Sequence, residues 1–513
     1  MLNSVDFSGR PFHFIGIGGI GMSALAYVLA KRNLPVSGSD ICLNHITQRL
    51  QDQGAHVFWS QDAANLEFYR LNGASPQSVT AVSSTGAIAN GTTFQPTTST
   101  KLPVAVSDHD SDRLLPQVIC STAINPTNPE YRAALELGCP IFHRSDVLAR
   151  LMQDYRSIAV AGTHGKTTTS SMLGYLLLQA GLDPTIVVGG EVNAWNGNAY
   201  VGNGPYLVAE ADESDGSLVK LAAEIGVITN IELDHPDHYS NLDEVVKIFK
   251  TFTERCKILV ACLDCTTVSR DLKPTISYSL DPAMGADYSV ENPVYKAGET
   301  TATVLERGKP LGQLTLKLLG KHNLSNALAV VAIGRLLGLE FSQIASILVS
   351  FEGARRRFER RGEYNGILVV DDYAHHPSEI QVTLAAARIQ ADAAGKQGRL
   401  VAVFQPHRYS RTQAFLSEFA TSFGEADLVI TTDIYGASEA NAGDMNGPKV
   451  ADAIASHHPH VVYQPTLPDV MDYLKATLVP GDLVLFLGAG NLNRIIPDLL
   501  SYYQSVEDAR AAL

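Results

Sequence analysis

The sequence predicts an α/β protein built from three domains. Two glycine-rich turns, which begin at Gly16 and Gly162, each follow a short apolar segment and precede a stretch of helical character. Nearer the C-terminus, short apolar strands alternate with helical segments, a pattern typical of a parallel sheet. The chain has 513 residues, and at about 150 residues a domain this length favours three domains. We expect them at residues 1–150, 151–356 and 357–513.

The first domain begins with a nucleotide-binding type of turn. A strand over residues 12–17 leads into Gly16-Ile-Gly-Gly-Ile-Gly21, a helix follows, and a second strand ends at Asp40. In this G-x-G-x-x-G pattern the glycines let the backbone approach a diphosphate, and the acid can bind a ribose hydroxyl. The motif indicates diphosphate geometry and not NAD in particular, and the alternative is a turn without a ligand. The candidate residues are Gly16, Gly18, Gly19, Gly21 and Asp40.

Residues 60–116 differ in composition from the rest of the first domain. They are rich in Ser, Thr, Gly, Asn and Gln, which bury too little apolar surface to form a core. We therefore expect much of this range to be a long surface insertion.

The second glycine-rich turn predicts a phosphate-binding loop. A short buried strand precedes Gly162-Thr-His-Gly-Lys-Thr-Thr168, and an apolar helix closed by Gly181 follows. Backbone N–H groups and the helix N-terminus attract phosphate, Lys166 can reach the terminal phosphates, and the Thr167 hydroxyl can bind a metal. Val160 stands where the usual pattern has its first glycine, so the loop is a shorter form. The alternative is a glycine-rich turn with a chance lysine. The candidate residues are Gly162, Thr163, His164, Gly165, Lys166, Thr167 and Thr168.

Acidic residues follow the next apolar strand of the central domain. Glu210-Ala-Asp-Glu-Ser-Asp215 lies at the carboxyl end of a buried strand, where P-loop enzymes hold Mg²⁺. A second strand ends near His235, which could bind a further Mg²⁺ or contact substrate. The alternatives are a solvated acidic turn and a local turn network. Thr167, Glu210 and His235 are thus the candidate metal ligands.

Two asparagines and a run of arginines lie later in the central domain. Asn323 and Asn326 share one helical face, and their amides could read adenine or cap the helix, so both interpretations stay open. The segment 351–358 contains Gly353 and three arginines and suggests a hinge that faces an anionic cleft.

The third domain carries polar groups after its strands. Asp372, His375 and His376 follow one strand, and Arg408 and Arg411 follow the next. Polar residues after strand ends mark the binding edge of a parallel sheet, and arginine suits carboxylate or phosphate groups. Surface charge at a helix start is the alternative for the two arginines.

Composition excludes several classes of protein. A net charge of −14 argues against non-specific nucleic-acid binding, which needs a basic face. No apolar run has the length of a membrane span, and residues 1–10 do not resemble a signal peptide. Six cysteines in so long a chain indicate reduced thiols and not a disulfide framework. We expect a cytoplasmic protein without a membrane partner.

Together these motifs resemble the Mur ligase family of peptidoglycan synthesis, and they span nearly the whole chain in the family's order. Besides the two glycine turns, they are Glu-Ala-Asp-Glu-Ser-Asp, Thr-Asn-Ile-Glu-Leu-Asp-His, Gly-Lys-His-Asn, Arg-Arg-Arg-Phe, Asp-Asp-Tyr-Ala-His-His-Pro and Gln-Pro-His-Arg-Tyr-Ser-Arg-Thr. The resemblance is closest to the members that join L-alanine to UDP-N-acetylmuramate with ATP. It implies a Rossmann-like UDP-binding domain, a P-loop-type central ATPase domain and a Rossmann-like C-terminal domain for the amino acid.

The resemblance also implies roles for individual residues. It implies that Lys166 and its loop hold ATP, that Thr167, Glu210 and His235 bind the divalent metals, and that Asn323 and Asn326 lie at adenine. Arg357, Asp372, His375, His376, Arg408 and Arg411 fall in motifs that line the cleft. Of these, Lys166, His235, Asp372, His375 and His376 are the expected catalytic residues, Arg357 is expected at ATP, and Arg408 and Arg411 at the amino acid or carboxylate. The sequence departs from the family at Ala374 and Ser378, and residues 60–116 match it weakly, which leaves the uracil contacts open.

Four other functions would each explain part of the sequence. A sister ligase recycles a whole tripeptide onto the same UDP-sugar, but its first glycine loop differs. Folate polyglutamate ligases share the central domain but not the first glycine motif. An NAD-dependent dehydrogenase leaves the P-loop unexplained, and a nucleotide-binding regulator without activity leaves the intact Lys166, Thr167, Glu210 and His235 unexplained. A monomer or a homodimer is expected.

Overall fold

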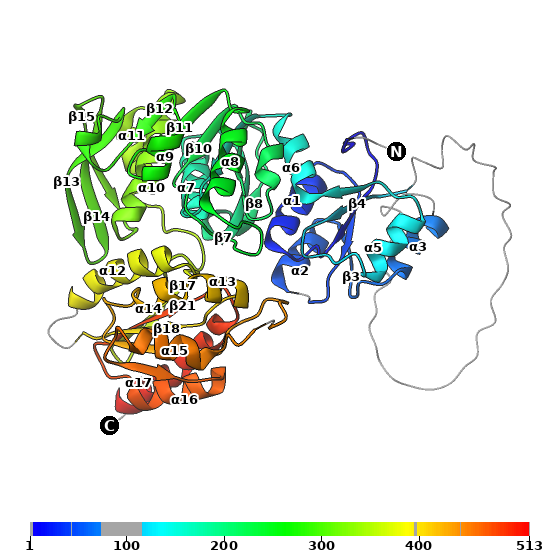
Figure 1. Cartoon of the computed structure of the whole chain (residues 1–513). Coiled ribbons are helices and arrows are strands. Elements are labelled where there is room, and N and C mark those ends of the chain that lie inside the picture. Colours follow the sequence, from blue (N-terminus) through cyan, green and yellow to red (C-terminus); the bar gives the residue numbers. More distant parts are fainter. Residues whose placement is uncertain (1–3, 43, 73–114, 394–397, 442, 512–513) are drawn as a thin grey trace, which may run out of the picture. The chain divides into compact units, whose positions relative to one another are not determined.

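The computed structural model describes residues 4–42, 44–72, 115–393, 398–441 and 443–511. The chain divides into two compact units, Met1–Leu151 and Met152–Leu513. Within the described residues, the first unit contains one sheet and the second contains two, each accompanied by helices (Figure 1). This mixed α/β build with three sheets confirms the predicted fold class.

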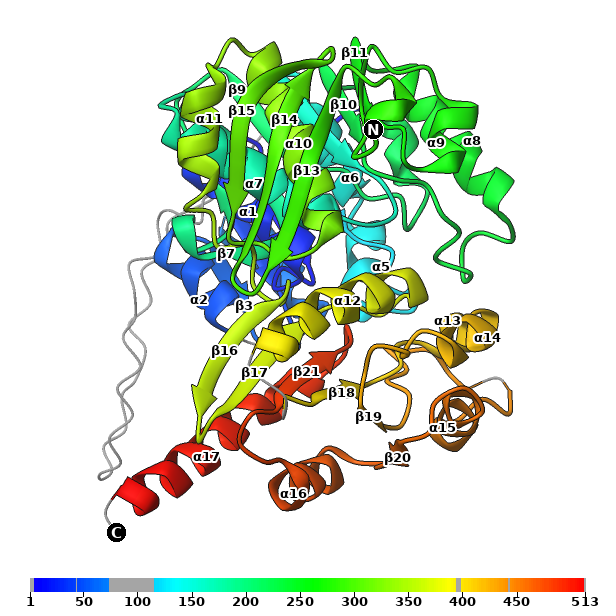
Figure 2. The same cartoon turned by 90° about the vertical axis from the view of Figure 1, so that its left-hand side faces the viewer.

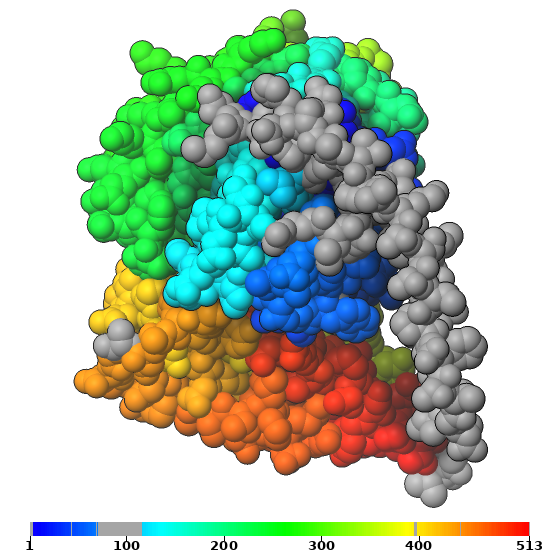
Figure 3. All heavy atoms as spheres, turned by 90° about the vertical axis from the view of Figure 1, so that its right-hand side faces the viewer, coloured from blue at the N-terminus to red at the C-terminus, as the bar shows by residue number. Residues whose placement is uncertain are grey.

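The first unit is a five-stranded parallel sheet with helices. In chain order its elements are β1 (Phe12–Ile15), α1 (Ile20–Lys31), β2 (Val36–Ser39), α2 (His45–Asp52), β3 (His56–Phe58), α3 (Ala64–Asn72), β4 (Gln117–Cys120), α5 (Pro129–Glu136), β5 (Ile141–His143) and α6 (Arg144–Met152). The strands lie in the order β3-β2-β1-β4-β5, and all pairs are parallel. The order reverses at β1, so the glycine turn after β1 lies at the point where such sheets bind ligands. The atoms of this unit, blue to cyan, form one continuous body in Figure 3.

The predicted surface insertion, residues 60–116, contains ordered structure at its start. Helix α3 lies in this range, and its Leu66 and Tyr69 are buried in the core of the first unit. These two apolar residues, spaced for one helical face, are outweighed in composition by the polar residues around them, which is why the prediction missed the helix. Residues 73–114 lie outside the described part of the chain.

The second unit begins with a ten-stranded sheet. Its elements are β6 (Arg156–Ala161), α7 (Lys166–Gln179), β7 (Thr185–Val192), β8 (Gly197–Tyr200), β9 (Tyr206–Glu210), β10 (Ile225–Ile228), α8 (Leu242–Thr253), β11 (Ile258–Cys262), α9 (Thr266–Asp271), β12 (Ile276–Tyr278), β13 (Tyr288–Lys296), β14 (Glu299–Glu306), β15 (Lys309–Leu316), α10 (Lys321–Leu336) and α11 (Phe341–Leu348). The order is β15-β14-β13-β12-β11-β10-β6-β9-β7-β8. Strands β13, β14 and β15 add an antiparallel edge, visible as three long neighbouring arrows in Figure 2.

Helix α7 is buried on nearly every side against this sheet. Its residues 167–174 are all buried, including five Thr and Ser in its first turns. A Cβ atom at Gly174 would lie 2.9 Å from Ile186 on β7, so glycine allows the helix to pack closely on the strand. The close packing fixes the start of α7, and therefore the loop before it.

The second unit ends with a six-stranded sheet. Its elements are β16 (Glu359–Tyr364), β17 (Ile367–Asp372), α12 (Pro377–Ala393), β18 (Leu400–Phe404), α13 (Tyr409–Ala414), α14 (Leu416–Ala420), β19 (Leu428–Thr431), α15 (Gly447–Ala455), β20 (Val461–Tyr463), α16 (Leu467–Thr477), β21 (Leu483–Leu487) and α17 (Ile496–Ala511). The order is β16-β17-β21-β18-β19-β20, and only the β16–β17 edge is antiparallel. The predicted parallel sheet is thus confirmed, and β16 and β20 are additions to it. Among the described residues, no helix is both long enough and apolar enough to cross a bilayer.

Candidate active site

The glycine turn at residues 162–165 joins β6 to α7 and has the backbone of a phosphate-binding loop. Gly162 has φ +139° and Gly165 has φ +81°, values that favour glycine. A Cβ atom at Gly162 would lie 2.0 Å from Thr229 Oγ1, and one at Gly165 would lie 2.7 Å from Asn326 Oδ1. Both glycines are therefore required by conformation and by space, and Asn326 lies directly beside the loop.

The loop lysine is held by its own loop and by a carboxylate. Lys166 Nζ donates to the carbonyl oxygens of Gly162 at 2.7 Å and Thr163 at 3.0 Å, and to Glu213 at 2.8 Å. Burial raises the pKa of the Glu213 carboxyl to about 7 despite the nearby ammonium group. Burial alone would lower the pKa of Lys166, but Glu213 raises it above its ordinary value. The lysine therefore stays charged, with an anion already at its tip.

Thr167 and Glu210 form an oxygen-rich pair beside this lysine. The Thr167 hydroxyl donates to Glu210 Oε1 at 2.9 Å, and the N–H of Gly189 donates to Glu210 Oε2 at 2.6 Å. Arg357 Nη2 donates to Thr167 Oγ1 at 3.3 Å. A hydroxyl and a carboxylate are donors that suit Mg²⁺, so this pair fits a hard cation.

His235 lies on a strained loop that a buried ion pair fixes. Its φ is +54°, which is unusual outside glycine. Burial lowers the pKa of His235 to about 4. Next to it, Asp234 accepts from Arg411 Nε at 2.9 Å, and both side chains are at most 6% exposed. Burial would raise the pKa of Asp234, but the Arg411 guanidinium holds it well below its usual range.

A pocket of about 200 Å³ opens beside the loop. It is lined by His164 and Gly165 of the loop, by the start of α10, by the segment 353–358 and by α12. Asn323 and Asn326 line it and are 6% and 7% exposed. Neither caps α10: Asn323 Nδ2 donates to Leu319 O at 2.8 Å, and the N-cap position is Gly320. This geometry disfavours the helix-cap alternative and leaves both amides at a pocket wall.

Histidines and carboxylates gather at the edge of the pocket. His164 Nδ1 lies 3.0 Å from Glu379 Oε1, and Nε2 lies 3.4 Å from Glu232 Oε2. Burial opposes a charge on His164, but the two carboxylates raise its pKa to about 10. The rings of His164 and His376 lie 4.7 Å apart. Burial, with the charge of His164, lowers the pKa of His376 to about 4.

Asp372 and His375 lie where β17 meets α12. Asp372 Oδ2 accepts from the N–H of Phe358 at 2.6 Å, and Oδ1 accepts from the N–H of Ala374 at 2.7 Å. Burial raises the pKa of Asp372 to about 6 against the opposing effect of Arg357. His375 Nδ1 lies 2.9 Å from Tyr373 O and 3.2 Å from Glu379. Both side chains are thus held in place by their surroundings.

The segment 351–358 directs its three arginines in different directions. Arg355 pairs with Glu191 at 3.0 Å, Arg356 donates to Gly488 O at 2.6 Å, and Arg357 contacts Thr167. Arg356 and Phe358 have positive φ, so the backbone is strained on both sides of Arg357. Only Arg357 among the three lines the pocket. Of the three arginines, it is therefore the candidate for contact with an anionic ligand.

Arg408 also stands in a strained conformation. Its φ is +69°, and Nη1 donates to Asp237 at 2.7 Å and to Glu439 at 3.1 Å. Beside it, the ring of His407 stacks on Tyr435 at 5.7 Å. Arg408 and Arg411 thus already pair with carboxylates of the protein. To bind the carboxylate of a ligand, each arginine must exchange its protein partner or be shared between the two carboxylates.

The glycine turn of the first unit has a carboxylate as its support. Gly16 has φ +81°. The N–H of Gly18 donates to Asp40 Oδ2 at 2.8 Å, and that of Cys42 donates to Asp40 Oδ1 at 3.0 Å. Asp40 therefore braces the turn with Oδ2, while Oδ1 binds the backbone just after β2. Strands β2 and β3 are parallel, and Ser39 pairs with Phe58. The next residue on the β3 side is Trp59, which is level with Asp40 and 74% exposed.

Comparison with known proteins places the chain in a family. The model of the Mur ligase family catalytic domain matches residues 11–156, that of the Mur ligase middle domain matches 160–334, and that of the Mur ligase glutamate ligase domain matches 356–490. The chain belongs to the Mur ligase family. It is 63% identical over 503 residues to the UDP-N-acetylmuramate–L-alanine ligase of Nostoc punctiforme, with 98% of each chain covered. It is 58% identical to the ligase of the same name from Microcystis aeruginosa, again with 98% of each covered.

Solved structures of Mur ligases agree with the fold. The UDP-N-acetylmuramate–alanine ligase of Thermotoga maritima is 28% identical, with a TM-score of 0.75 over 97% of this chain and 100% of that one. The murein peptide ligase of Psychrobacter arcticus is 21% identical, with a TM-score of 0.66 over 97% and 99%, a likeness of fold alone.

The structure brings most of the predicted residues of this Mur ligase to one place, although their roles stay predictions. The loop residues Gly162 to Thr168 lie with Glu210, Arg357, Asn323 and Asn326, and with Asp372, His375 and His376 across the pocket edge. Sequence reasoning missed Glu213, Glu232, Glu379 and His322. His322 lines the pocket, and its buried Nδ1 makes no hydrogen bond. The second acid of Glu-Ala-Asp-Glu could have pointed to Glu213, whereas no local signal marks Glu379 as a partner of His164.

Proposed function

We propose that this Mur ligase joins L-alanine to the lactyl carboxylate of UDP-N-acetylmuramate and converts ATP to ADP and phosphate, a step of cell-wall precursor synthesis. The observation that carries the proposal is the full-length identity to ligases of that name, 63% over 98% of both chains. The phosphate-binding loop, with its lysine, threonine and neighbouring carboxylates, supports it independently.

The first half-reaction activates a poor electrophile. A carboxylate oxygen of the sugar attacks the terminal phosphorus of ATP, ADP leaves, and an acyl phosphate forms. Lys166 is placed to neutralise the transferring phosphoryl group, and for this it must exchange Glu213 for a phosphate oxygen. We assign the adenine to the pocket wall formed by Asn323, Asn326 and His322, whose pKa burial lowers to about 4. Arg357, held near Thr167, supplies further positive charge.

A divalent cation fits the Thr167–Glu210 pair. The hydroxyl and the carboxylate lie 2.9 Å apart and offer oxygen donors, and a neutral His235 is a suitable additional ligand. Mg²⁺ bound there would neutralise charge on the phosphates. The protein holds the pair through the N–H of Gly189 and through Arg357.

The second half-reaction forms the amide. The neutral amine of L-alanine attacks the carbonyl carbon, and phosphate leaves from the tetrahedral intermediate. The amine must lose a proton, and a neutral histidine next to the cleft can accept it. Burial keeps His376 neutral, and Glu379 orients His375. Arg408 and Arg411 are suited to the carboxylate of the amino acid.

The first unit is proposed to hold the UDP-sugar. Gly16, Gly18, Gly19 and Gly21 form the turn that approaches the diphosphate, at the switch point of the sheet. Asp40 accepts a hydrogen bond from Gly18 of the turn, so we assign it a bracing role in addition to any contact with the ribose. The exposed indole of Trp59, level with Asp40, is a platform on which the uracil can stack. Since both nucleotides are cytoplasmic metabolites of a growing cell, we place the reaction in the cytoplasm.

The test is phosphate release from ATP, with and without UDP-N-acetylmuramate and each amino acid. Release that requires both the UDP-sugar and L-alanine is the expected result. Release with a tripeptide in place of alanine would assign the chain to peptide recycling. ATP binding without release under any combination would favour a regulator. Sedimentation of the same preparation would decide between a monomer and a homodimer.

A further inference from the structure

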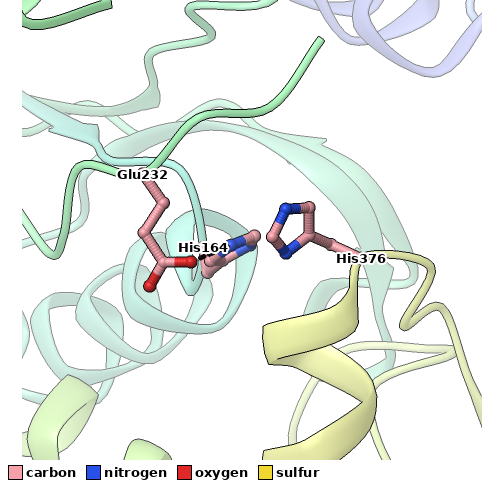
Figure 4. A group of neighbouring side chains, drawn as sticks. All are labelled: His164, Glu232 and His376. Carbon is pink, nitrogen blue, oxygen red and sulfur yellow. Dashed lines mark ion pairs between the residues drawn. The ribbon is translucent and has the colours of Figure 1, made fainter. Parts of the chain in front are cut away.

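Three side chains, of which only His376 has a chemical role in the proposed reaction, converge in the second unit. His164 comes from the loop after β6, Glu232 from the loop after β10, and His376 from the start of α12. One nitrogen or oxygen atom from each lies within 4.8 Å of the others. Figure 4 shows the His164 ring between the Glu232 carboxylate and the His376 ring. Their convergence from three separate segments is the arrangement of a metal site and not of a local turn.

The separation of two of these atoms suits a tetrahedral ion. His164 Nε2 and Glu232 Oε2 lie 3.4 Å apart. Two ligands bound to Zn²⁺ at about 2.0–2.1 Å with a tetrahedral angle lie about 3.4 Å apart. His164 Nε2 is buried and makes no hydrogen bond, and it faces Glu232 Oε2 as an ion pair. The His376 atom lies within 4.8 Å of the other two, so this ring has to move closer to complete the set.

The second ring nitrogen of His164 has the partner that metal-bound histidines have. Its Nδ1 lies 3.0 Å from Glu379 Oε1, and a carboxylate on the far nitrogen orients a ligating imidazole and makes it a stronger donor. His376 makes only long contacts, 3.2 Å from Nε2 to Leu233 O and 3.3 Å from the N–H of Ser378 to Nδ1. Either nitrogen can therefore turn to a metal.

We propose that His164, Glu232 and His376 form a binding site for Zn²⁺ or a similar borderline cation, separate from the Thr167–Glu210 pair. Two imidazoles and one carboxylate are a known donor set for zinc with one open position, whereas a set with two nitrogen donors suits Mg²⁺ poorly. The ion takes the place of the proton that two carboxylates hold on His164. It ties α12 to the phosphate-binding loop.

The proposed site has a consequence for ATP binding, which rests on the proposed function. His164 and Glu232 line the pocket that we assign to ATP. Zn²⁺ at this site should therefore compete with ATP in the presence of excess Mg²⁺. If the metal binds and ATP does not compete, the metal site stands and the assignment of the pocket to ATP fails.

The experiment titrates Zn²⁺ alone into the purified full chain without nucleotide, by calorimetry, and repeats it with Co²⁺ while its visible spectrum is recorded. We expect one ion per chain and a tetrahedral Co²⁺ spectrum. Glu232→Gln and His376→Gln should each weaken binding by at least ~100-fold, and Glu379→Gln by ~10–100-fold. His238→Gln, on the loop that carries Glu232, and Glu210→Gln, at the magnesium pair, should bind as the unaltered chain does.

Two results would overturn the proposal. One is the absence of Zn²⁺ binding to the unaltered chain at micromolar concentration. The other is binding that survives Glu232→Gln and His376→Gln but is lost in Glu210→Gln. Circular dichroism of each variant shows whether it folds, and the Co²⁺ spectrum of the unaltered chain tests the donor set without any variant.

Discussion

The two glycine turns of this chain use one backbone device in two electrostatic settings. In both, a buried strand leads into a glycine with positive φ, Gly16 or Gly162, and a helix follows. The first turn is braced by one carboxylate, Asp40, and the first turn of α1 contains no lysine. The second begins its helix with Lys166, which is already paired with Glu213. The difference matches the two proposed tasks. The first turn offers backbone N–H groups, which suit a diphosphate, and the second adds a charged lysine, which suits the transfer of a phosphoryl group.

The largest effect expected from this contrast comes from Lys166→Ala. Loss of the charge that meets the transferring phosphoryl group should reduce turnover by at least ~10²–10³-fold. Binding of UDP-N-acetylmuramate, which we assign to the first unit, should stay within about twofold of that of the unaltered chain. Phosphate release measures the first quantity and calorimetry the second. Loss of UDP-sugar binding in this variant would contradict the separation of the two turns.

Gly162→Ala against Gly19→Ala tests how tightly each backbone is constrained. A Cβ atom at Gly162 meets Thr229 Oγ1 at 2.0 Å, and φ is +139°. At Gly19, φ is −62° and the nearest atom is 3.4 Å away. We expect Gly162→Ala to lower the free energy of unfolding of the second unit by ~3 kcal/mol or more and Gly19→Ala to change that of the first by less than ~1 kcal/mol. Urea unfolding checks both, and equal effects would refute the distinction.

The charged setting of the second unit should also appear in its pH dependence. The folded pKa of Asp372 is about 6, raised from 3.8 by burial. Between these values the folded state holds the proton more tightly, so the free energy of unfolding falls as pH rises from about 4 to 6, by on the order of 2–3 kcal/mol. Below about pH 4 both states are protonated, and the penalty is absent.

Asp372→Asn removes this contribution, because the amide does not ionise. The difference in unfolding free energy between the variant and the unaltered chain should therefore grow in favour of the variant from pH 4 to 7. Chemical unfolding at a series of pH values measures it. A difference that is constant over this range would show that burial does not control this carboxyl group.

The smallest effect concerns the first unit. Trp59→Ala should raise the Kd for UDP-N-acetylmuramate by ~5–10-fold, about 1 kcal/mol, through loss of stacking. Leu135, another exposed apolar residue of the unit at 56% exposure, provides the matched control, since Leu135→Ala should leave Kd unchanged. Equal effects of both variants would remove the uracil platform from the proposal.

The sequence predicts this fold well where the signal is local. Strand, turn and helix around both glycine motifs lie within about four residues of their predicted bounds, because apolar periodicity and glycine positions are local properties. The helix α3 was missed where polar composition outweighed two apolar residues. The antiparallel strands β13 to β15 join the central sheet by long-range pairing, which no local pattern contains.

The positions of the candidate residues on their strands and helices were predictable, but the contacts between their side chains were not. Motif spacing placed Lys166, Thr167 and Glu210 correctly relative to their strands, and the Thr167–Glu210 contact follows from adjacent parallel strands. The partners Lys166–Glu213, His164–Glu379 and Arg411–Asp234 join residues 47, 215 and 177 positions apart. Side-chain pairing over such separations depends on packing, which sequence patterns do not encode.

The Arg411–Asp234 pair has a consequence for protein engineering. Both side chains are almost fully buried. Asp234 lies in the loop after β10 of the ten-stranded sheet, and Arg411 lies on α13, which follows β18 of the six-stranded sheet. A chimera that replaces only residues 357–513 with a foreign segment lacking an arginine at this position would leave Asp234 buried without its cation, at a cost of about 3–5 kcal/mol. Domain exchange among these ligases must therefore transfer the two residues as a unit, and a mismatch there would make recombination fail even where every surface loop is compatible.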